Sequence, residues 1–190
     1  GEFISAAEGK DLLDTITKAD FDFPDVSKTG SYRKEEGWIE KHIDQVLAYS
    51  MVDIEGIRNA NLKVAVDPVN STGGIAIPVL LEKLGVKGVE MINGDVSGKF
   101  AHNPEPLKEH LTEISQIVVD RRCDMGIVVD PDVDRLALIS ENGEMFGEEY
   151  TLVALADYYM RNKPGATVSN LSSSRALRDV TESAGQSYSA

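Results

Sequence analysis

One stretch, residues 125–140, constrains this chain more than any other, and it reads M-G-I-V-V-D-P-D-V-D-R-L-A-L-I-S. Residues 126–129 are an apolar run rich in β-branched side chains, which predicts a buried strand. Residues 136–139 form a second apolar run. Between the two runs, three carboxylates stand at alternate positions and a guanidinium follows them: Asp130, Asp132, Asp134 and Arg135.

An extended chain would keep these carboxylates apart. Alternate residues of a strand lie about 6.6 Å apart, so Asp130 and Asp134 would be about 13 Å apart. No ion with ligands at about 2.1–2.5 Å can bridge that distance. Pro131 fixes φ and removes a backbone donor, which favours a turn in which the carboxylates converge. Oxygen ligands suit Mg²⁺ or Ca²⁺ rather than zinc, so a divalent metal site is predicted, with a solvated acidic turn as the alternative.

Two other protein classes use similar Asp-x-Asp patterns. An EF-hand loop needs Gly at its sixth position and helices on both sides. Counted from Asp130, the sixth residue is Arg135 and the flanks predict strands, although Glu141 does fall at the twelfth position. A haloacid-dehalogenase-type phosphatase also has Asp-x-Asp after a buried strand, but usually continues with Thr or Val where this chain has Asp134. Both interpretations fit the stretch less well and are kept as alternatives.

The order of the predicted elements sets the fold class. Strands at 62–67, 89–92 and 126–129 alternate with helices at about 74–84 and 107–121. Repeated βαβ units predict an α/β fold with a mainly parallel sheet and helices on both faces. The aspartates follow the carboxyl end of their strand, which is where such sheets bind ligands.

Further elements are predicted on either side of this unit. Ser5 with Glu8 forms a capping box at the start of one helix. Asn142-Gly143 predicts a hairpin between residues 136–140 and 144–146. The G-G pair before the helix at 74–84 lacks both phosphate-loop spacings, so close packing of helix on strand is favoured over nucleotide binding. The remaining predicted elements are helices at 6–19, 35–51, 148–161 and 174–184 and a strand at 166–171.

Composition excludes several functions. With 19 basic and 32 acidic residues the net charge is −13, which argues against nucleic acid or an anionic membrane surface as a partner. No apolar stretch is long enough to span a membrane. Cys123 is the single cysteine, so no intramolecular disulfide can form, and a cytoplasmic location is expected. Cys123 itself is expected to be a small buried residue rather than a nucleophile.

D-P-D-V-D-R resembles the metal-binding loop of the α-D-phosphohexomutases, usually written D-G-D-x-D-R. That family includes phosphoglucomutase, phosphomannomutase and phosphoglucosamine mutase. D-P-V-N-S-T-G-G at 67–74 and N-P-E-P-L at 103–107 resemble motifs of the family's second domain. Pro131 departs from the usual Gly but leaves the carboxylates in place. The F-A-H-N-P segment is not expected to be the family's T-A-S-H-N-P serine loop, because Ala101 stands in the serine's place.

The resemblance implies a domain division and a set of site residues. Residues 1–30 would be the tail of a first domain and a linker, 31–144 the second domain with the metal-binding loop, and 145–190 the truncated start of a third domain. Asp130, Asp132 and Asp134 would bind Mg²⁺. Arg135 would contact phosphate, with an ion pair to one of the aspartates as the alternative.

The resemblance also implies an activity for the parent enzyme. It would interconvert hexose 6-phosphate and hexose 1-phosphate through a phosphoserine and a bisphosphorylated sugar. No serine loop, G-E-x-S-G-H sugar loop or R-x-S-G-T phosphate loop is found in the sequence, so the fragment alone is expected to be inactive and the hexose stays open. The alternative is a self-contained, non-catalytic α/β module that binds a divalent metal.

Both ends are expected to be cut, since the first residue is Gly and no closing element is predicted after residue 185. The strand at 166–171 would then lack its flanking strands. A strand with free edges seeks a partner, and the apolar face of the helix at 150–159 needs cover. This segment is therefore expected to pack against the preceding domain or against a second copy of itself, which would give a dimer of the fragment through the truncated third domain.

Overall fold

The computed structural model describes residues 3–19 and 22–190, and the chain divides into two units, Gly1–Glu36 and Gly37–Ala190. The expected tail and linker at 1–30 therefore includes residues that lie outside the described ones. Helix α1 (Ala6–Lys18) begins at Ser5, whose Oγ accepts from the Glu8 N–H at 3.3 Å while the Glu8 carboxylate accepts from the Ser5 N–H at 2.7 Å. The predicted capping box is confirmed. A short 3₁₀ turn, η1 (Val26–Lys28), follows.

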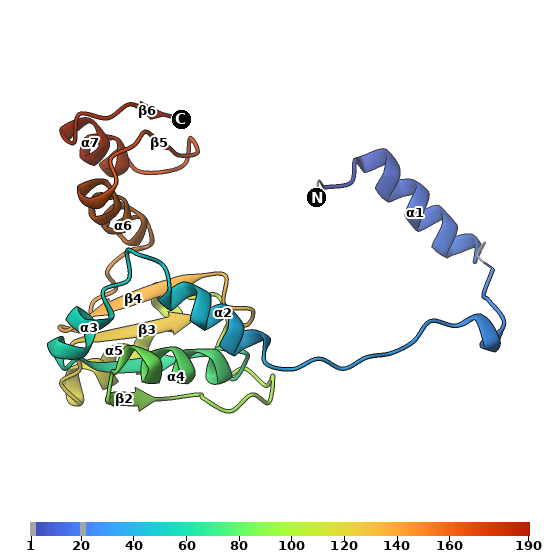
Figure 1. Cartoon of the computed structure of the whole chain (residues 1–190), viewed down its shortest axis with the longest axis horizontal. Helices are drawn as coiled ribbons and strands as arrows, with labels where there is room; N and C mark the ends of the chain where they lie inside the picture. Colours follow the sequence, from blue (N-terminus) through green and yellow to red (C-terminus); the bar gives the residue numbers. More distant parts are fainter. Residues whose placement is uncertain (1–2, 20–21) are drawn as a thin grey trace. The chain divides into compact units, whose positions relative to one another are not determined.

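A four-stranded sheet in the order β2-β1-β3-β4 is the centre of the second unit (Figure 1). Strand β1 pairs in parallel with both β2 and β3, and β4 pairs antiparallel with β3. The predicted α/β fold with a mainly parallel sheet is confirmed. The strands are β1 (Lys63–Asp67), β2 (Gly88–Met91), β3 (Met125–Val129) and β4 (Leu136–Ser140).

Helices cover both faces of this sheet, as predicted. On one face, Ile77 and Leu81 of α4 (Gly73–Leu84) join a buried cluster with Val64 and Val66 of β1. On the other face, α5 (Thr112–Asp120) packs its Ile114 and Val118 into a second cluster that includes Ala65. Successive residues of a strand point to opposite faces, so β1 supplies both clusters in alternation.

Cys123 lies in the cluster beneath α5 and is 2% exposed. Burial raises the pKa of its thiol, which keeps the sulfur protonated. The expectation that Cys123 is a small buried residue is therefore confirmed, and that it is not a nucleophile stays a prediction.

Several helix boundaries differ from the sequence prediction. The helix expected at 35–51 is α2 (Trp38–Leu47), and a separate short helix, α3 (Ile54–Ala60), was missed. Its signal is the cap at Asp53, whose carboxylate accepts from the Gly56 N–H at 2.8 Å. The helix expected at 107–121 is divided at Leu111, which leaves helical geometry and is buried at 2% exposure. The 3₁₀ turn η2 (Lys108–His110) precedes that break.

The Asn142-Gly143 turn forms as predicted, with Gly143 at a φ of +81°. The strand expected beyond it at 144–146 is reduced to one bridge, between Ile139 and Met145, and the Phe146 N–H donates to the Leu138 oxygen at 2.8 Å.

After this turn come α6 (Glu148–Asn162), β5 (Thr167–Val168), α7 (Ala176–Ser183) and β6 (Tyr188–Ser189). The strand expected at 166–171 is only two residues long, and β6 pairs with it in parallel. The expectation that no closing element follows residue 185 was therefore wrong. Self-association of the chain stays a prediction. Of its two grounds, the exposed apolar side chains of α6 remain, while β5 no longer has two free edges. Among the described residues, no helix is both long and apolar enough to cross a membrane.

Candidate metal centre

Polar side chains gather at one edge of the sheet. Asp67 ends β1, Asp130 directly follows β3, and Asn93 lies just beyond β2. These three strands are parallel, so their carboxyl ends meet at the same edge (Figure 1).

The loop after β3 curls tightly around the Asp130 carboxylate. Its Oδ1 accepts from the backbone N–H groups of Asp134 at 3.0 Å and Arg135 at 3.1 Å. The Val133 N–H donates to the Asp130 carbonyl at 3.1 Å, and Val133 itself takes a left-handed φ of +63°. That conformation is unfavourable for a β-branched residue, so the surrounding hydrogen bonds must hold it.

This curl brings the three carboxylates together. One oxygen from each of Asp130, Asp132 and Asp134 lies within 4.8 Å of the others. The convergence predicted from the sequence is confirmed, and the extended alternative with its separation of about 13 Å is excluded. Ligands of an octahedral magnesium ion lie about 3.0 Å apart when neighbouring and about 4.2 Å apart when opposite, so the carboxylates would have to move inward to surround one.

The electrostatics of the three carboxylates also suit a cation. Burial raises the pKa of the Asp130 carboxyl, but the hydrogen bonds that it accepts from Arg135 and Asp134 outweigh this and leave that pKa below its ordinary value. The pKa of Asp134 is raised, first by its hydrogen bond with Asp130 and then by the charges of Asp132 and Asp130. Asp132 and Asp134 are exposed, which leaves room for water ligands. The donor set therefore fits an oxygen-liganded divalent cation.

Arg135 lies beside the carboxylates but takes its closest partner from elsewhere. Its Nη1 donates to the Glu105 carboxylate, and this bond raises the pKa of Arg135. Its Nε lies 4.0 Å from Asp130 Oδ2 and 3.9 Å from Asp134 Oδ1, so contact with the aspartates is looser. Glu105 was not predicted as a site residue, because it precedes Arg135 by 30 positions and no local pattern connects them.

Asn70 anchors the loop that carries Glu105. Its side-chain amide donates to Asp95, and its Oδ1 accepts from the Ala101 N–H at 2.9 Å. Its backbone accepts from the Gly98 N–H at 2.9 Å and donates to the Asn93 carbonyl at 2.8 Å. The loop at 93–107 is therefore fixed along its length rather than free in solvent.

A second anchor of that loop is Asp67, which is only 1% exposed. Its carboxylate accepts from the Val69 N–H at 3.0 Å and from the Asn93 amide at 3.2 Å. His102 Nε2 lies 3.0 Å from the same carboxylate, and His102 Nδ1 lies 2.8 Å from the Asn103 carbonyl. Both ring nitrogens thus lie within hydrogen-bond distance of an oxygen atom, which fixes the orientation of the ring. Sequence reasoning noted the missing serine in this loop and missed the role of its histidine.

The glycine pair at the start of α4 is explained by packing. A Cβ at Gly73 would lie 2.6 Å from Val129 Cγ2, and one at Gly74 would lie 2.4 Å from the Gly94 carbonyl oxygen. Neither position tolerates a side chain, so the predicted close packing of this helix on the strands is confirmed.

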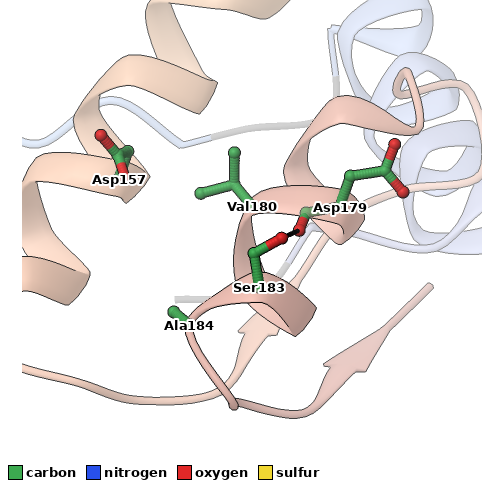
Figure 2. A pocket seen from close by; sticks show the side chains of 5 residues that line it. All are labelled: Asp157, Asp179, Val180, Ser183 and Ala184. Atoms are coloured by element: carbon green, nitrogen blue, oxygen red, sulfur yellow. Dashed lines mark hydrogen bonds between the residues drawn. The ribbon is translucent and has the colours of Figure 1, made fainter.

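A separate hollow of about 340 Å³ lies at α6 and α7, and Figure 2 shows its five lining side chains. Its two carboxylates are each paired with an arginine, Asp157 with Arg161 of the same helix and Asp179 with Arg175, which directly precedes α7. With its charges already paired, this hollow does not present a converging donor set like the aspartate loop.

The fold and the loop define a class: an α/β domain whose mainly parallel sheet presents a loop of converging carboxylates at its carboxyl edge. The chain belongs to the phosphoglucomutase/phosphomannomutase family, because the family model described as phosphoglucomutase/phosphomannomutase, alpha/beta/alpha domain II, matches residues 40–143. The resemblance found in the sequence is confirmed.

Individual relatives agree with this assignment. A phosphoglucomutase/phosphomannomutase of Thermococcus kodakarensis is 34% identical over 158 residues, which are 82% of this chain and 34% of that protein. A phosphopentomutase of the same organism is 31% identical over 147 residues, which are 74% of this chain and 32% of that protein. A solved phosphoglucomutase/phosphomannomutase family protein of Burkholderia thailandensis shares the fold, with a TM-score of 0.77 at 21% identity, covering 97% of this chain and 38% of that one. The chain spans about a third of the length of the curated relatives that it matches.

Proposed function

We propose that this chain is the metal-binding part of a phosphohexomutase. The parent enzyme would interconvert hexose 6-phosphate and hexose 1-phosphate through a phosphoserine and a bisphosphorylated sugar. The observation that carries the proposal is the convergence of three carboxylate oxygens within 4.8 Å at the carboxyl edge of the sheet, in a chain of this family.

The site residues have two tasks in this proposal, metal binding and phosphate binding. Asp130, Asp132 and Asp134 hold Mg²⁺, and Asp130 in addition keeps the loop curled through its two backbone hydrogen bonds. A bound Mg²⁺ supplies positive charge that stabilises and orients a transferring phosphoryl group. Arg135 offers its guanidinium to phosphate oxygens, which it can engage in pairs.

The names of the relatives support a sugar phosphate as substrate and leave the sugar open. One matched relative is named for glucose and mannose, another for glucosamine and galactosamine, and a third for a pentose. The shared chemistry of these names is the phosphate, and that is the group which the aspartate loop and Arg135 would meet.

Calorimetric titration of the chain with Mg²⁺ tests the metal assignment. We expect weak binding, because Mg²⁺ keeps several waters and usually relies on substrate phosphate for further ligands. Asp132→Asn should abolish that binding. Asp11→Asn is the matched control, since it removes the same charge from an exposed position on α1 and should leave binding unchanged. Tight binding that survives Asp132→Asn would refute the assignment of this loop.

The chain alone should have no mutase activity, because no serine loop that could carry the phosphoryl group is found in the sequence. Incubation of the purified chain with glucose 1-phosphate and Mg²⁺ should yield no glucose 6-phosphate. A rate that rises in proportion to the concentration of the chain would contradict the proposal that the carrier lies elsewhere in the parent.

A further inference from the structure

We propose that Glu105 is a positioning residue for Arg135: it holds the guanidinium beside the aspartates but off them, so that the carboxylates stay open to a cation. This inference rests on the proposed function, because it takes the aspartate loop to be a cation site. It adds a role for a residue 30 positions away in the sequence.

Arg135 is the natural competitor of a metal ion at this loop. Its Nε lies only 4.0 Å from Asp130 and 3.9 Å from Asp134, so a small rotation of the side chain would bring it into direct contact with both. A guanidinium bonded to those carboxylates would occupy the oxygens that a cation needs. The structure instead gives Arg135 a third carboxylate, that of Glu105, as its closest partner.

Glu105 is held in place before Arg135 reaches it. Its backbone N–H donates to the Asn103 side chain at 3.0 Å, and its carbonyl accepts from the Leu107 N–H at 2.8 Å. His110 Nδ1 also lies 2.8 Å from that carbonyl. Proline on either side, at 104 and 106, restricts the backbone further. The backbone of Glu105 is therefore anchored without the help of Arg135, and this places its carboxylate within reach of the long arginine side chain.

The solvent exposure of the Arg135–Glu105 ion pair indicates that the pair positions the guanidinium rather than stabilises the fold. The side chains of Arg135 and Glu105 are 53% and 45% exposed, and exposed ion pairs contribute only about 0–1 kcal/mol to stability. A partner bound that loosely can be exchanged, so an arriving phosphate can replace the Glu105 carboxylate on the guanidinium. Glu105 thus keeps Arg135 available for an anion while it keeps Asp130 and Asp134 available for a cation.

Calorimetric Mg²⁺ titration of the whole chain tests this role through a double-mutant cycle. Glu105→Gln should weaken Mg²⁺ binding by about threefold or more, because Arg135 then turns to the aspartates. In an Arg135→Gln background the same substitution should have little effect. Glu109→Gln, which removes the same charge from an exposed residue of η2, is the matched control and should bind as the starting chain does. An equal loss with and without Arg135 would overturn the inference, because it would reflect the lost charge alone.

A metal-free measurement separates this inference from the proposed function. The NMR signal of the Arg135 Nε–H should respond strongly to Asp134→Asn in a Glu105→Gln chain and weakly when Glu105 is present. Equal responses in the two chains would overturn the positioning role even if Mg²⁺ binds. Failure of the starting chain to bind Mg²⁺ would count against the proposed function, while the NMR comparison would still decide where Glu105 holds the guanidinium.

Discussion

Two acidic groups lie at the ends of neighbouring parallel strands, and the protein treats them in opposite ways. Asp67, at the end of β1, is buried and bonded to Val69, Asn93 and His102. The aspartate loop after β3 buries only Asp130, while Asp132 and Asp134 stay exposed. Asp67 therefore contributes to the stability of the fold, whereas the exposed carboxylates of Asp132 and Asp134 remain accessible to a ligand from solvent.

The physical reason is the distribution of donors. A buried carboxylate is costly unless hydrogen-bond donors surround it, and around Asp67 the protein supplies them. In the aspartate loop the backbone donors go to Asp130, and the hydrogen bonds and charges among the three carboxylates raise the pKa of Asp134. The repulsion among these three carboxylates is not relieved by the protein, and a bound cation would relieve it.

The largest expected effect is on stability, and it should appear at Asp67 alone. Asp67→Asn removes a buried charged acceptor from three partners, Val69, Asn93 and His102, and should lower the free energy of unfolding by about 3 kcal/mol. Asp132→Asn removes an equal charge from an exposed position and should leave that free energy nearly unchanged. Urea unfolding of both variants in the presence of a chelator makes the comparison. Similar losses in the two variants would remove the distinction between the two groups.

Mg²⁺ should produce the next largest effect, and only through the aspartate loop. At a free concentration ten times its Kd, a ligand that binds the folded state alone stabilises it by about 1.4 kcal/mol. For a chain of this length that raises Tm by about 4 °C. Thermal unfolding with and without Mg²⁺ should show this shift in the starting chain and in Asp67→Asn, and not in Asp132→Asn. A shift that disappeared with Asp67 would mean that the two groups act as one site.

The smallest effect should be the pH dependence caused by Asp134. Its pKa is raised above the ordinary value of 3.8, so its ionised form is disfavoured in the folded chain. Asp134→Asn should therefore stabilise the metal-free chain slightly at pH 7. The gain should shrink as the pH falls through the raised pKa and vanish below 3.8, where the original carboxyl is protonated in both states. Unfolding at pH 7 and pH 3 with a chelator measures it, and a gain that persisted at pH 3 would contradict this cause.

The sequence predicted the loop better than it predicted the surroundings of the loop. Alternate aspartates and Pro131 lie within a few residues, so local geometry was enough to predict that they converge. The contacts of Glu105 with Arg135 and of Asp67 with His102 depend on how the sheet brings distant loops together. No periodicity or spacing encodes such a pairing.

The elements that were missed are short and carry little periodic signal of their own. Helix α3 is too short to show a clear helical period, and its only sequence signal is the capping residue Asp53. Strand β6 is two residues long and is defined by its pairing with β5 rather than by its own composition. The parallel sheet, by contrast, rests on short strands that alternate with helical stretches, and this order of elements is visible in the sequence.

The antiparallel pairing of β4 with β3 makes the acidic loop a local feature of the chain, which we expect to form early in folding. Its ligands lie within residues 130–134, between two paired strands, so closing the loop costs little chain entropy. A hairpin of this kind forms in about 1–10 μs. The contacts of Arg135 with Glu105 and of Asp67 with His102 close loops of 30 and 35 residues, and they require the parallel strands to be in place. We therefore expect the three aspartates to meet before the other contacts of this edge form.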